Sequence, residues 1–284
     1  MGRQLFEINL AMLLISTSGA IGRYITIVPT TSIWVRSLLA AVILFCFCMF
    51  SRLSFKINRK ADLVNILLSG LFLGLHWTLY FYSLQYTNVA IAMLTLFTFP
   101  LFTAIAEPIF YKTGWSFSQL AGSIMVLIGL YVLLPSTDLS DNNVMGILIG
   151  IGSSLSYTIR NLILKPQVSR YNGSVLMTYQ LIVVTLLMIP FQLEISFTEI
   201  WDFALPLAIL ALFTTSMGHT LFLRSFKYFS LSMASILSSL QPIYGIIIAL
   251  IFLGEVPELN SILGGVLILG TVVITSVSLK TKAK

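Results

Sequence analysis

Titratable and aromatic side chains stand inside apolar stretches of this sequence, where polar groups are costly to bury. His76 and Tyr80 are four residues apart, so on a helix they share one face. Trp77 lies beside them, and His219 occurs in a second apolar stretch. Imidazoles can bind an anionic group or accept a proton, and an aromatic wall with a hydrogen-bonding tip suits a small amphipathic or cationic solute. We predict that these four residues contact a small-molecule substrate; the alternative is that they pack or hydrogen-bond within helix interfaces.

Further polar residues flank two prolines in the interiors of apolar stretches. Pro100 and Pro242 each remove a helical hydrogen bond and are predicted to kink their helices. The carbonyls freed by a kink are tolerated only beside protein or water, so Thr98 and Gln241 are expected to reach a cavity there. Tyr157 follows a Gly/Ser-rich stretch that permits another helix to approach closely, and it is predicted either to face the same cavity or to pack.

Isolated charges near the ends of the apolar stretches suggest entrances. The chain can be aligned with itself so that Arg23 overlies Arg160, and each is predicted to hold a carboxylate at one mouth. The alternative, which also covers Arg36 and Arg224, is that these side chains snorkel to lipid headgroups. Glu107 lies inside an apolar stretch and is expected either to pair with a basic group or to serve as a proton site in coupling.

The sequence offers little material for catalysis. It has no His-x-x-x-His, Asp-rich or Gly-x-Ser-x-Gly motif, and no phosphate-cradling loop. Cys46 and Cys48 are two residues apart, face different directions on a helix, and support neither a disulfide nor a metal site. We therefore predict no catalytic residues, no metal and no cofactor, and an intramembrane enzyme or a channel-like protein is the weaker alternative.

The composition identifies the elements that must position these residues. Of the 284 residues, 57% are hydrophobic and 9% are charged, whereas soluble domains carry about 25% charged residues. This excludes a soluble globular enzyme and a disordered chain. An all-α integral membrane protein with ten transmembrane helices is predicted, because a span needs about 20 apolar residues. The expected spans are 5–22, 31–50, 63–83, 88–111, 117–134, 144–164, 173–191, 203–223, 231–252 and 260–279.

Charges alternate between successive predicted loops. Lysines and arginines collect in one set of loops and at both termini, and aspartates and glutamates collect in the other set. Because basic loops remain on the cytoplasmic side, we predict a multi-pass protein of the cytoplasmic (inner or plasma) membrane with both termini cytoplasmic. The scattered basic groups indicate contact with the lipid bilayer and no nucleic-acid partner.

The chain partly matches itself when it is shifted by half its length. Pro100 then falls on Pro242, and the segment YSLQY at 82–86 falls on RSFKY at 224–228. Each half, residues 1–135 and 136–284, contains five predicted spans. Because five is odd, the second half enters the membrane inverted, which is a signature of transporters that alternate a central site between two sides.

The sequence also resembles a known family. The resemblance rests on RSLLAA at 36–41, on YFYSLQYTNVAIA at 80–92, on residues 232–242 and on LGE at 253–255. These segments resemble the drug/metabolite transporter superfamily of the EamA type, which implies two EamA-like five-helix repeats, cytoplasmic termini and a cavity between the halves. One departure is that Gly254-Glu255 has no copy in the first half, where Lys112-Thr113-Gly114 stands.

Together the residues and the resemblance predict a carrier for a small organic metabolite, such as an amino acid or an amine. The resemblance implies export or exchange, and the repeat implies alternating access. The expected partners are a small-molecule substrate and the bilayer, with the protein a monomer or weak dimer.

Overall fold

The computed structural model describes residues 2–112, 142–192, 197–229, 231–238 and 240–282, together with Gly114, Met125, Ile128, Gly129, Tyr131 and Val132. Within these residues all regular secondary structure is helical. Nine of the ten predicted spans coincide with single helices or with two or three consecutive helices in the described ranges. The fifth, predicted at 117–134, falls almost entirely outside the described residues.

The first half contains four of these spans. Their helices are α1 (Gly2–Tyr24), α2 (Pro29–Phe50), α3 (Lys60–Tyr86), α4 (Val89–Leu96) and α5 (Phe99–Tyr111). Pro29 suits the first turn of α2 because proline lacks an N–H and has a helical φ. Asn88 begins α4, since its side-chain oxygen accepts a hydrogen bond of 2.9 Å from the backbone N–H of Ile91.

The second half repeats this order with two differences. Its helices are α7 (Asn142–Val168), α8 (Gly173–Met188) with the 3₁₀ turn η1 (Ile189–Phe191), α9 (Phe197–Asp202), α10 (Ala204–Ile209), η2 (Leu210–His219), α11 (Thr220–Ser225), α12 (Leu231–Leu237), α13 (Leu240–Leu253) and α14 (Leu259–Lys282). The short helix α9 lies in a predicted loop. The segment η2 is a π-helix within the α10–η2–α11 span, and the sequence did not predict it.

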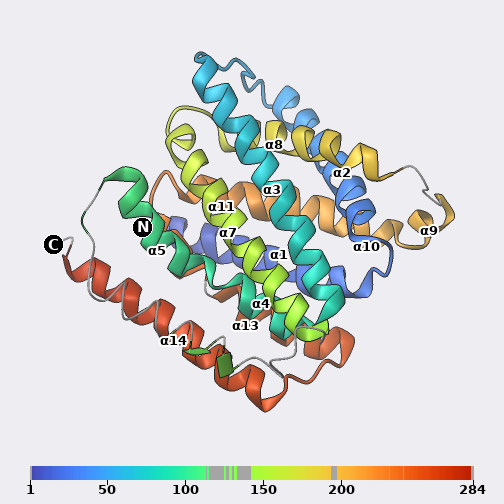
Figure 1. Ribbon diagram of the computed structural model, residues 1–284. Coiled ribbons are helices and arrows are strands. Elements are labelled where there is room, and N and C mark those ends of the chain that lie inside the picture. The colour runs from blue at the N-terminus through green and yellow to red at the C-terminus, as the bar shows by residue number, and fades with distance from the viewer. Residues whose placement is uncertain are drawn as a thin grey trace.

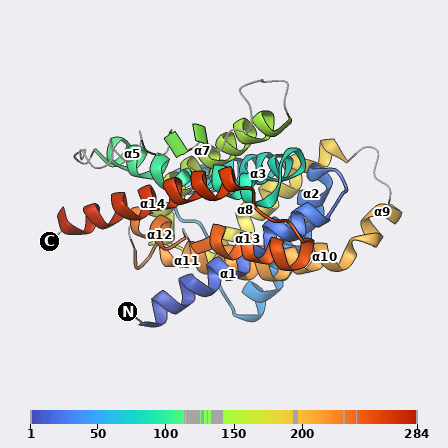
Figure 2. The ribbon, with the colours of Figure 1, turned by 90° about the horizontal axis from the view of Figure 1, so that it is seen from below.

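The helices have the lengths and surfaces of membrane spans. Among the described residues, seven apolar helices are long enough to cross a bilayer, and two shorter apolar helices accompany them. At 27 residues α3 is about 40 Å long, which exceeds the roughly 30 Å of a hydrocarbon core. Large apolar side chains such as Phe50 and Phe252 are exposed on the outside. The start of α1 and the end of α14 lie toward the same side in both views (Figures 1 and 2).

Equivalent helices of the two halves make equivalent contacts with the opposite half. The third span of the first half, α3, packs against α7, and the third span of the second half packs through η2 against α1. The two second spans, α2 and α8, pack against each other, and α5 packs against α12. This pattern of contacts is expected when a twofold axis relates the two helix bundles. The centre of the molecule is therefore built from both halves (Figure 1).

Each of the two predicted kinks corresponds to a break in the helix. The first half interrupts its fourth span between Leu96 and Phe99, and Pro100 occupies the first turn of α5. The second half interrupts its fourth span between Leu237 and Leu240, and Pro242 occupies the first turn of α13. A proline in the first turn costs no hydrogen bond. Both breaks therefore place irregular backbone at the same depth of the repeat.

One glycine allows a close helix contact that positions the centre. A Cβ at Gly150 would overlap Thr95 Oγ1 and would lie 3.0 Å from Ser83 Oγ. Only glycine therefore lets α7 approach α3 and α4 this closely. Ser153 and Tyr157, which follow on α7, are brought against α3 as a result.

Candidate functional site

A narrow cavity, the central cavity, lies where both halves meet. It has a volume of about 20 Å³, enough for about one water molecule. All of its lining residues are buried. They are Ile15, Ser18, Arg36, His76, Trp77, Tyr80, Leu96, Phe97, Phe99, Tyr157, His219 and Gln241. Six of the seven residues predicted to contact substrate line this cavity, and Thr98 is the exception.

His76 is the best-anchored of these side chains. Its Nδ1 lies 2.8 Å from Ser153 Oγ and 3.2 Å from Ser153 O, and Ser153 Oγ donates to the His76 carbonyl at 2.9 Å. The imidazole stacks on Tyr157 with a centroid distance of 4.4 Å and lies 6.4 Å from Tyr80. The predicted shared face of His76 and Tyr80 is therefore present, and Tyr157 from α7 completes an aromatic stack.

Residues that the repeat relates to each other lie together in the lining of the central cavity. Trp77 and His219 are half the chain length apart, and their rings meet edge-on at 5.2 Å. Two further pairs of lining residues have the same separation in the sequence: Ile15 with Tyr157 and Phe99 with Gln241. The central cavity therefore lies on the axis that relates the two halves.

Arg36, which is not among the predicted site residues, also lines the central cavity. Its side chain is 1% exposed, so the interpretation that it snorkels to headgroups is wrong. The Nε and Nη2 atoms donate to Thr215 Oγ1 at 3.2 and 3.0 Å, and the guanidinium carbon lies 4.2 Å from the Trp77 ring centroid. The available signal was an arginine one to two turns inside an apolar helix. Its face could not be assigned without the packing of the π-helix η2, which carries Thr215.

The residues around the first helix break form hydrogen bonds with side chains of α7. Thr98 is buried, its hydroxyl donates to Thr95 O at 2.8 Å, and its Oγ1 also lies 2.8 Å from Ser154 Oγ. Thr158 Oγ1, one turn further along α7, donates to the Phe99 carbonyl at 3.3 Å. The carbonyls near the break are thus in part satisfied by α7. Thr98 contacts α7 and does not contribute to the cavity lining.

Arg160 does not lie at an entrance. It is 0% exposed, and it donates from Nε to Gln180 Oε1 and from Nη1 to Asn161 Oδ1, both at 2.9 Å. Its Nη2 lies 3.9 Å from Met177 Sδ. Arg160 therefore belongs to the interior between α7 and α8, and snorkelling is excluded for it as well.

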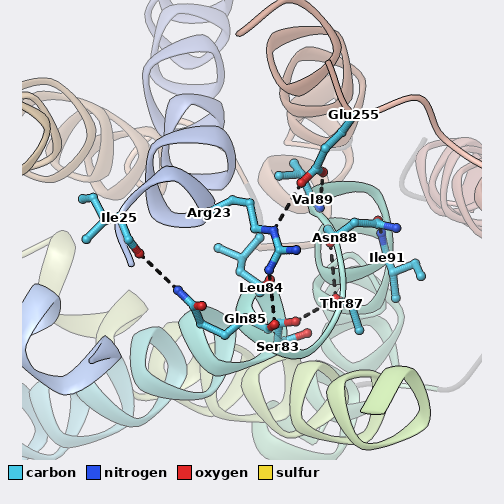
Figure 3. Close-up of polar contacts among 10 residues, drawn as sticks. All are labelled: Arg23, Ile25, Ser83, Leu84, Gln85, Thr87, Asn88, Val89, Ile91 and Glu255. Carbon is cyan, nitrogen blue, oxygen red and sulfur yellow. Dashed lines mark hydrogen bonds and ion pairs between the residues drawn. The ribbon is translucent and has the colours of Figure 1, made fainter. Parts of the chain in front are cut away.

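Arg23 lies in a polar cluster that joins the end of α1 to the turn between α3 and α4 and to the loop after α13 (Figure 3). This cluster consists of Arg23, residues 84–89 and Glu255. We call it the Arg23 end of the molecule. The guanidinium lies 3.3 Å from Glu255 Oε1 and donates to the carbonyls of Leu84 and Gln85 at 2.9 and 3.2 Å. Glu255 Oε2 accepts from the Val89 N–H at 2.9 Å. Figure 3 shows the Arg23 side chain between these partners.

The opposite end of the repeat has its own ion pair, which we call the Lys165 end. Lys165 Nζ on α7 lies 3.3 Å from Glu107 Oε1 on α5. This confirms that Glu107 pairs with a basic group. Lys165 follows Arg23 by half the chain length, so the repeat that relates the cavity residues pairs Arg23 with Lys165 rather than with Arg160. Lys165–Glu107 joins the first span of the second half to the fourth span of the first, and Arg23–Glu255 joins the first span of the first half to the loop that follows the fourth span of the second.

Cysteines and acidic residues form no metal centre in the part of the chain that the structure describes. Cys46 is exposed, and Cys48 is buried 4.0 Å from Thr178 Oγ1. Within the described ranges, no three His, Cys, Asp or Glu side chains gather in a group that could hold an ion.

The fold and the site define a class: a multi-pass α-helical membrane protein with two related bundles around a polar and aromatic centre. A sequence profile of the EamA-like transporter family matches the chain twice, over residues 5–134 and 144–277. The chain therefore belongs to the EamA-like transporter family and is a transporter of the drug/metabolite transporter superfamily.

Individual proteins show the same relationship. The uncharacterized transporter YxxF of Bacillus subtilis (strain 168) is 25% identical over 96% of this chain and 89% of its own length. An uncharacterized transporter of Archaeoglobus fulgidus is 28% identical over 69% of this chain and 70% of its own. A solved crystal structure at 16% identity superposes over 100% of both chains with a TM-score of 0.73, which supports the fold.

Proposed function

We propose that the protein carries a small organic metabolite, such as an amino acid or an amine, across the cytoplasmic membrane by alternating access, in export or exchange. The observation that carries this proposal is the position of the central cavity. It lies on the axis between the halves, and its lining comes from both of them. A site on such an axis can be exposed to either side by equivalent movements of the two halves.

The size of the cavity supports a closed state between two open ones. Pockets that hold small molecules usually measure about 300–1,000 Å³, whereas the central cavity measures about 20 Å³. A metabolite therefore enters only when the halves separate on one side. The Arg23 end and the Lys165 end are the contacts that such a separation would break, because each joins the first span of one half to the fourth span of the other or to the loop directly after it.

The lining favours a solute with an apolar body and a polar tip. Trp77, Phe97 and Phe99 supply apolar walls, and His76 and Tyr80 supply groups that hydrogen-bond. We assign His76, Trp77, Tyr80, Tyr157, His219 and Gln241 to substrate contact in the opened site. The basic loops support cytoplasmic termini; the Lys165 end is then cytoplasmic, and the Arg23 end faces the opposite side.

Flux into proteoliposomes tests the carrier directly. A thermal-shift screen of amino acids, amines and nucleobases on purified protein would first select a solute, which is then radiolabelled. We expect uptake that saturates and that accelerates when unlabelled solute is loaded on the far side. Flux that stays linear with concentration and ignores solute on the far side would indicate a channel, and chemical conversion of the solute would indicate an enzyme.

Substitutions at His76 and Tyr80 test the site. His76→Ala removes the imidazole from its stack with Tyr157, and Tyr80→Phe removes one hydroxyl from the lining. We expect each change to weaken saturable uptake by about tenfold, the effect of losing one or two hydrogen bonds. Tyr24→Phe, which alters an exposed tyrosine, serves as the matched control. Wild-type affinity and rate in both variants would remove the pair from the site.

A further inference from the structure

We propose, on the basis of the proposed carrier function, that the transported solute bears a carboxylate and that Arg36 binds it. Arg36 is a buried cation in the lining of the central cavity. Its Nη1 atom is buried and has no hydrogen-bond partner among the residues that the structure describes. A carboxylate is the group whose charge and planar geometry best match a free guanidinium N–H.

The surroundings of Arg36 do not compensate its charge. The ion pairs of the described residues use Glu7, Asp62, Glu107 and Glu255, and Arg36 takes part in none of them. Two of its nitrogens share the hydroxyl oxygen of Thr215. The Trp77 face offsets only part of the cost of burying a cation. Because an unpaired buried charge is expensive, an anionic solute would gain strongly from this position.

Arg160 shows what a structural buried arginine looks like in the same protein. Its Nε and Nη1 donate to amide oxygens of Gln180 and Asn161, and its Nη2 contacts the Met177 sulfur. Arg160 is absent from the cavity lining. The two buried arginines therefore differ in two respects: each nitrogen of Arg160 contacts an acceptor and its side chain lies outside the cavity lining, whereas Arg36 lines the cavity and its Nη1 has no partner among the described residues.

A second polar atom without a partner in the described part of the chain, Nδ1 of His219, belongs to a ring that contacts the Trp77 ring. His219 Nδ1 is buried without a partner among the described residues, and the His219 ring contacts Trp77, the residue on which the Arg36 guanidinium is placed. Thr215 and His219 both belong to the π-helix η2, a geometry that often marks functional sites. Arg36 and His219 thus both present polar atoms beside Trp77, and Trp77 with Phe97 supplies the wall for the remainder of the solute.

The experiment compares acids with their uncharged amides on the purified full-length protein in nanodiscs. The probes are leucine with leucinamide, phenylalanine with phenylalaninamide, and a 2-oxo acid with its amide. We expect the wild-type protein to bind at least one acid about ten to one hundred times more tightly than its amide, the effect of one charged hydrogen bond. Arg36→Gln should reduce this acid-to-amide ratio to about one, and Arg36→Lys should restore part of it.

Arg160→Gln is the matched control, because it also removes a buried arginine. It is expected to lower thermal stability and to keep the acid-to-amide ratio of the wild type. Gel filtration and circular dichroism show which variants are folded, and Arg36→Lys keeps the test valid if Arg36→Gln does not fold. A titration with sodium chloride distinguishes a carboxylate site from a site for small inorganic anions.

Three outcomes would overturn the inference: no acid in the panel binds better than its amide, Arg36→Gln keeps the ratio, or chloride alone binds. These outcomes differ from a failure of the proposed function. Saturable uptake that persists in Arg36→Gln would leave the carrier intact and remove the carboxylate anchor. Tight binding of an acid by a wild-type protein that shows no saturable flux would keep the anchor and remove the carrier.

Discussion

The Arg23 end and the Lys165 end occupy equivalent positions in the repeat, yet their cations make different sets of contacts. Arg23 bonds to one carboxylate and two backbone carbonyls, and the same carboxylate accepts from the start of α4. Among the described residues, Lys165 makes one ion pair, with Glu107 at 3.3 Å. Exposure does not separate the two ends, because the side chains are 35% and 24% exposed in the first pair and 26% and 17% in the second.

The difference follows from the two cations. A guanidinium presents several N–H groups in a planar fork. One arginine can therefore link α1 both to the end of α3 and to the loop after α13. A lysine ammonium is a compact charge, and partly exposed pairs of this kind contribute only about 0.2–1 kcal/mol. If the two ends open in turn, we expect the Lys165 end to open more readily. The comparison therefore predicts a carrier that rests with the Arg23 end closed.

The largest expected effect comes from removing the carboxylate of the Arg23 end. Glu255→Gln weakens the bond to Arg23 and removes the charge from the first turn of α4. We expect the Arg23 end to open about ten times more often, because a charged hydrogen bond contributes about 1.5–3 kcal/mol before solvent screening. The probe is the rate at which an impermeant maleimide labels Ser18→Cys, a cavity position, in a Cys46→Ala/Cys48→Ala background.

Glu258→Gln controls for this change, because Glu258 is an exposed carboxylate close to Glu255 in the sequence. It is expected to leave the labelling rate as it is. If Glu255→Gln labels no faster than the control from the Arg23 side, the Arg23 end does not close the cavity.

A smaller effect is expected at the opposite end. Glu107→Gln removes the carboxylate charge that Lys165 pairs with. Because partly exposed ion pairs contribute about 0.2–1 kcal/mol, loss of this pair should raise labelling of Ser18→Cys from the Lys165 side about two- to fivefold. Lys56→Gln, which alters an exposed lysine in a loop, is the control. The ratio of the labelling increase in Glu255→Gln to that in Glu107→Gln measures how much more firmly the Arg23 end is closed. An increase in Glu107→Gln equal to or larger than that in Glu255→Gln would contradict the expected difference between the ends.

The fold was largely predictable because the bilayer imposes simple requirements. Apolar runs, each close to the length that a membrane span needs, located the spans, such as 31–50 for α2 (Pro29–Phe50). The match of the chain to itself at half its length also predicted which helices are related. The π-helix η2 was not predictable, since an α-helix and a π-helix of the same residues have the same composition and the choice depends on tertiary packing.

Six of the residues predicted from the sequence line the central cavity; their contact with a substrate stays a prediction, and their arrangement was less predictable. Polar and aromatic residues inside spans indicated His76 and His219, because buried polar groups in a membrane need a purpose or a partner. The partners came from distant segments: Ser153 is 77 positions from His76, and Glu255 is 232 positions from Arg23. Arg36 was misjudged because depth alone cannot tell which side of a helix faces the protein.

The smallest expected effect concerns the backbone at the ends of the two fourth spans. Lys112 follows α5 with φ 55° and Gly254 follows α13 with φ 68°, and the two are repeat mates, half the chain length apart. The left-handed conformation suits glycine and costs other residues about 1 kcal/mol. Lys112→Gly should therefore raise the thermal midpoint of the purified protein by roughly 1–3 °C, and Gly254→Ala should lower it by a similar amount.

The substitutions at Lys112 and Gly254 measure the effect of backbone conformation on stability separately from side-chain contacts. A Cβ at Gly254 would meet nothing within 4 Å, so Gly254→Ala changes conformational preference without a clash. Lys112→Ala removes the ammonium and keeps the unfavourable φ, and it should leave the midpoint close to that of the wild type. The sequence difference between Lys112 and Gly254 then has a physical meaning: both halves end their fourth span with the same turn, and only the second half has the residue that this turn favours. A midpoint that rises as much in Lys112→Ala as in Lys112→Gly would assign the gain to lost charge and would end this equivalence.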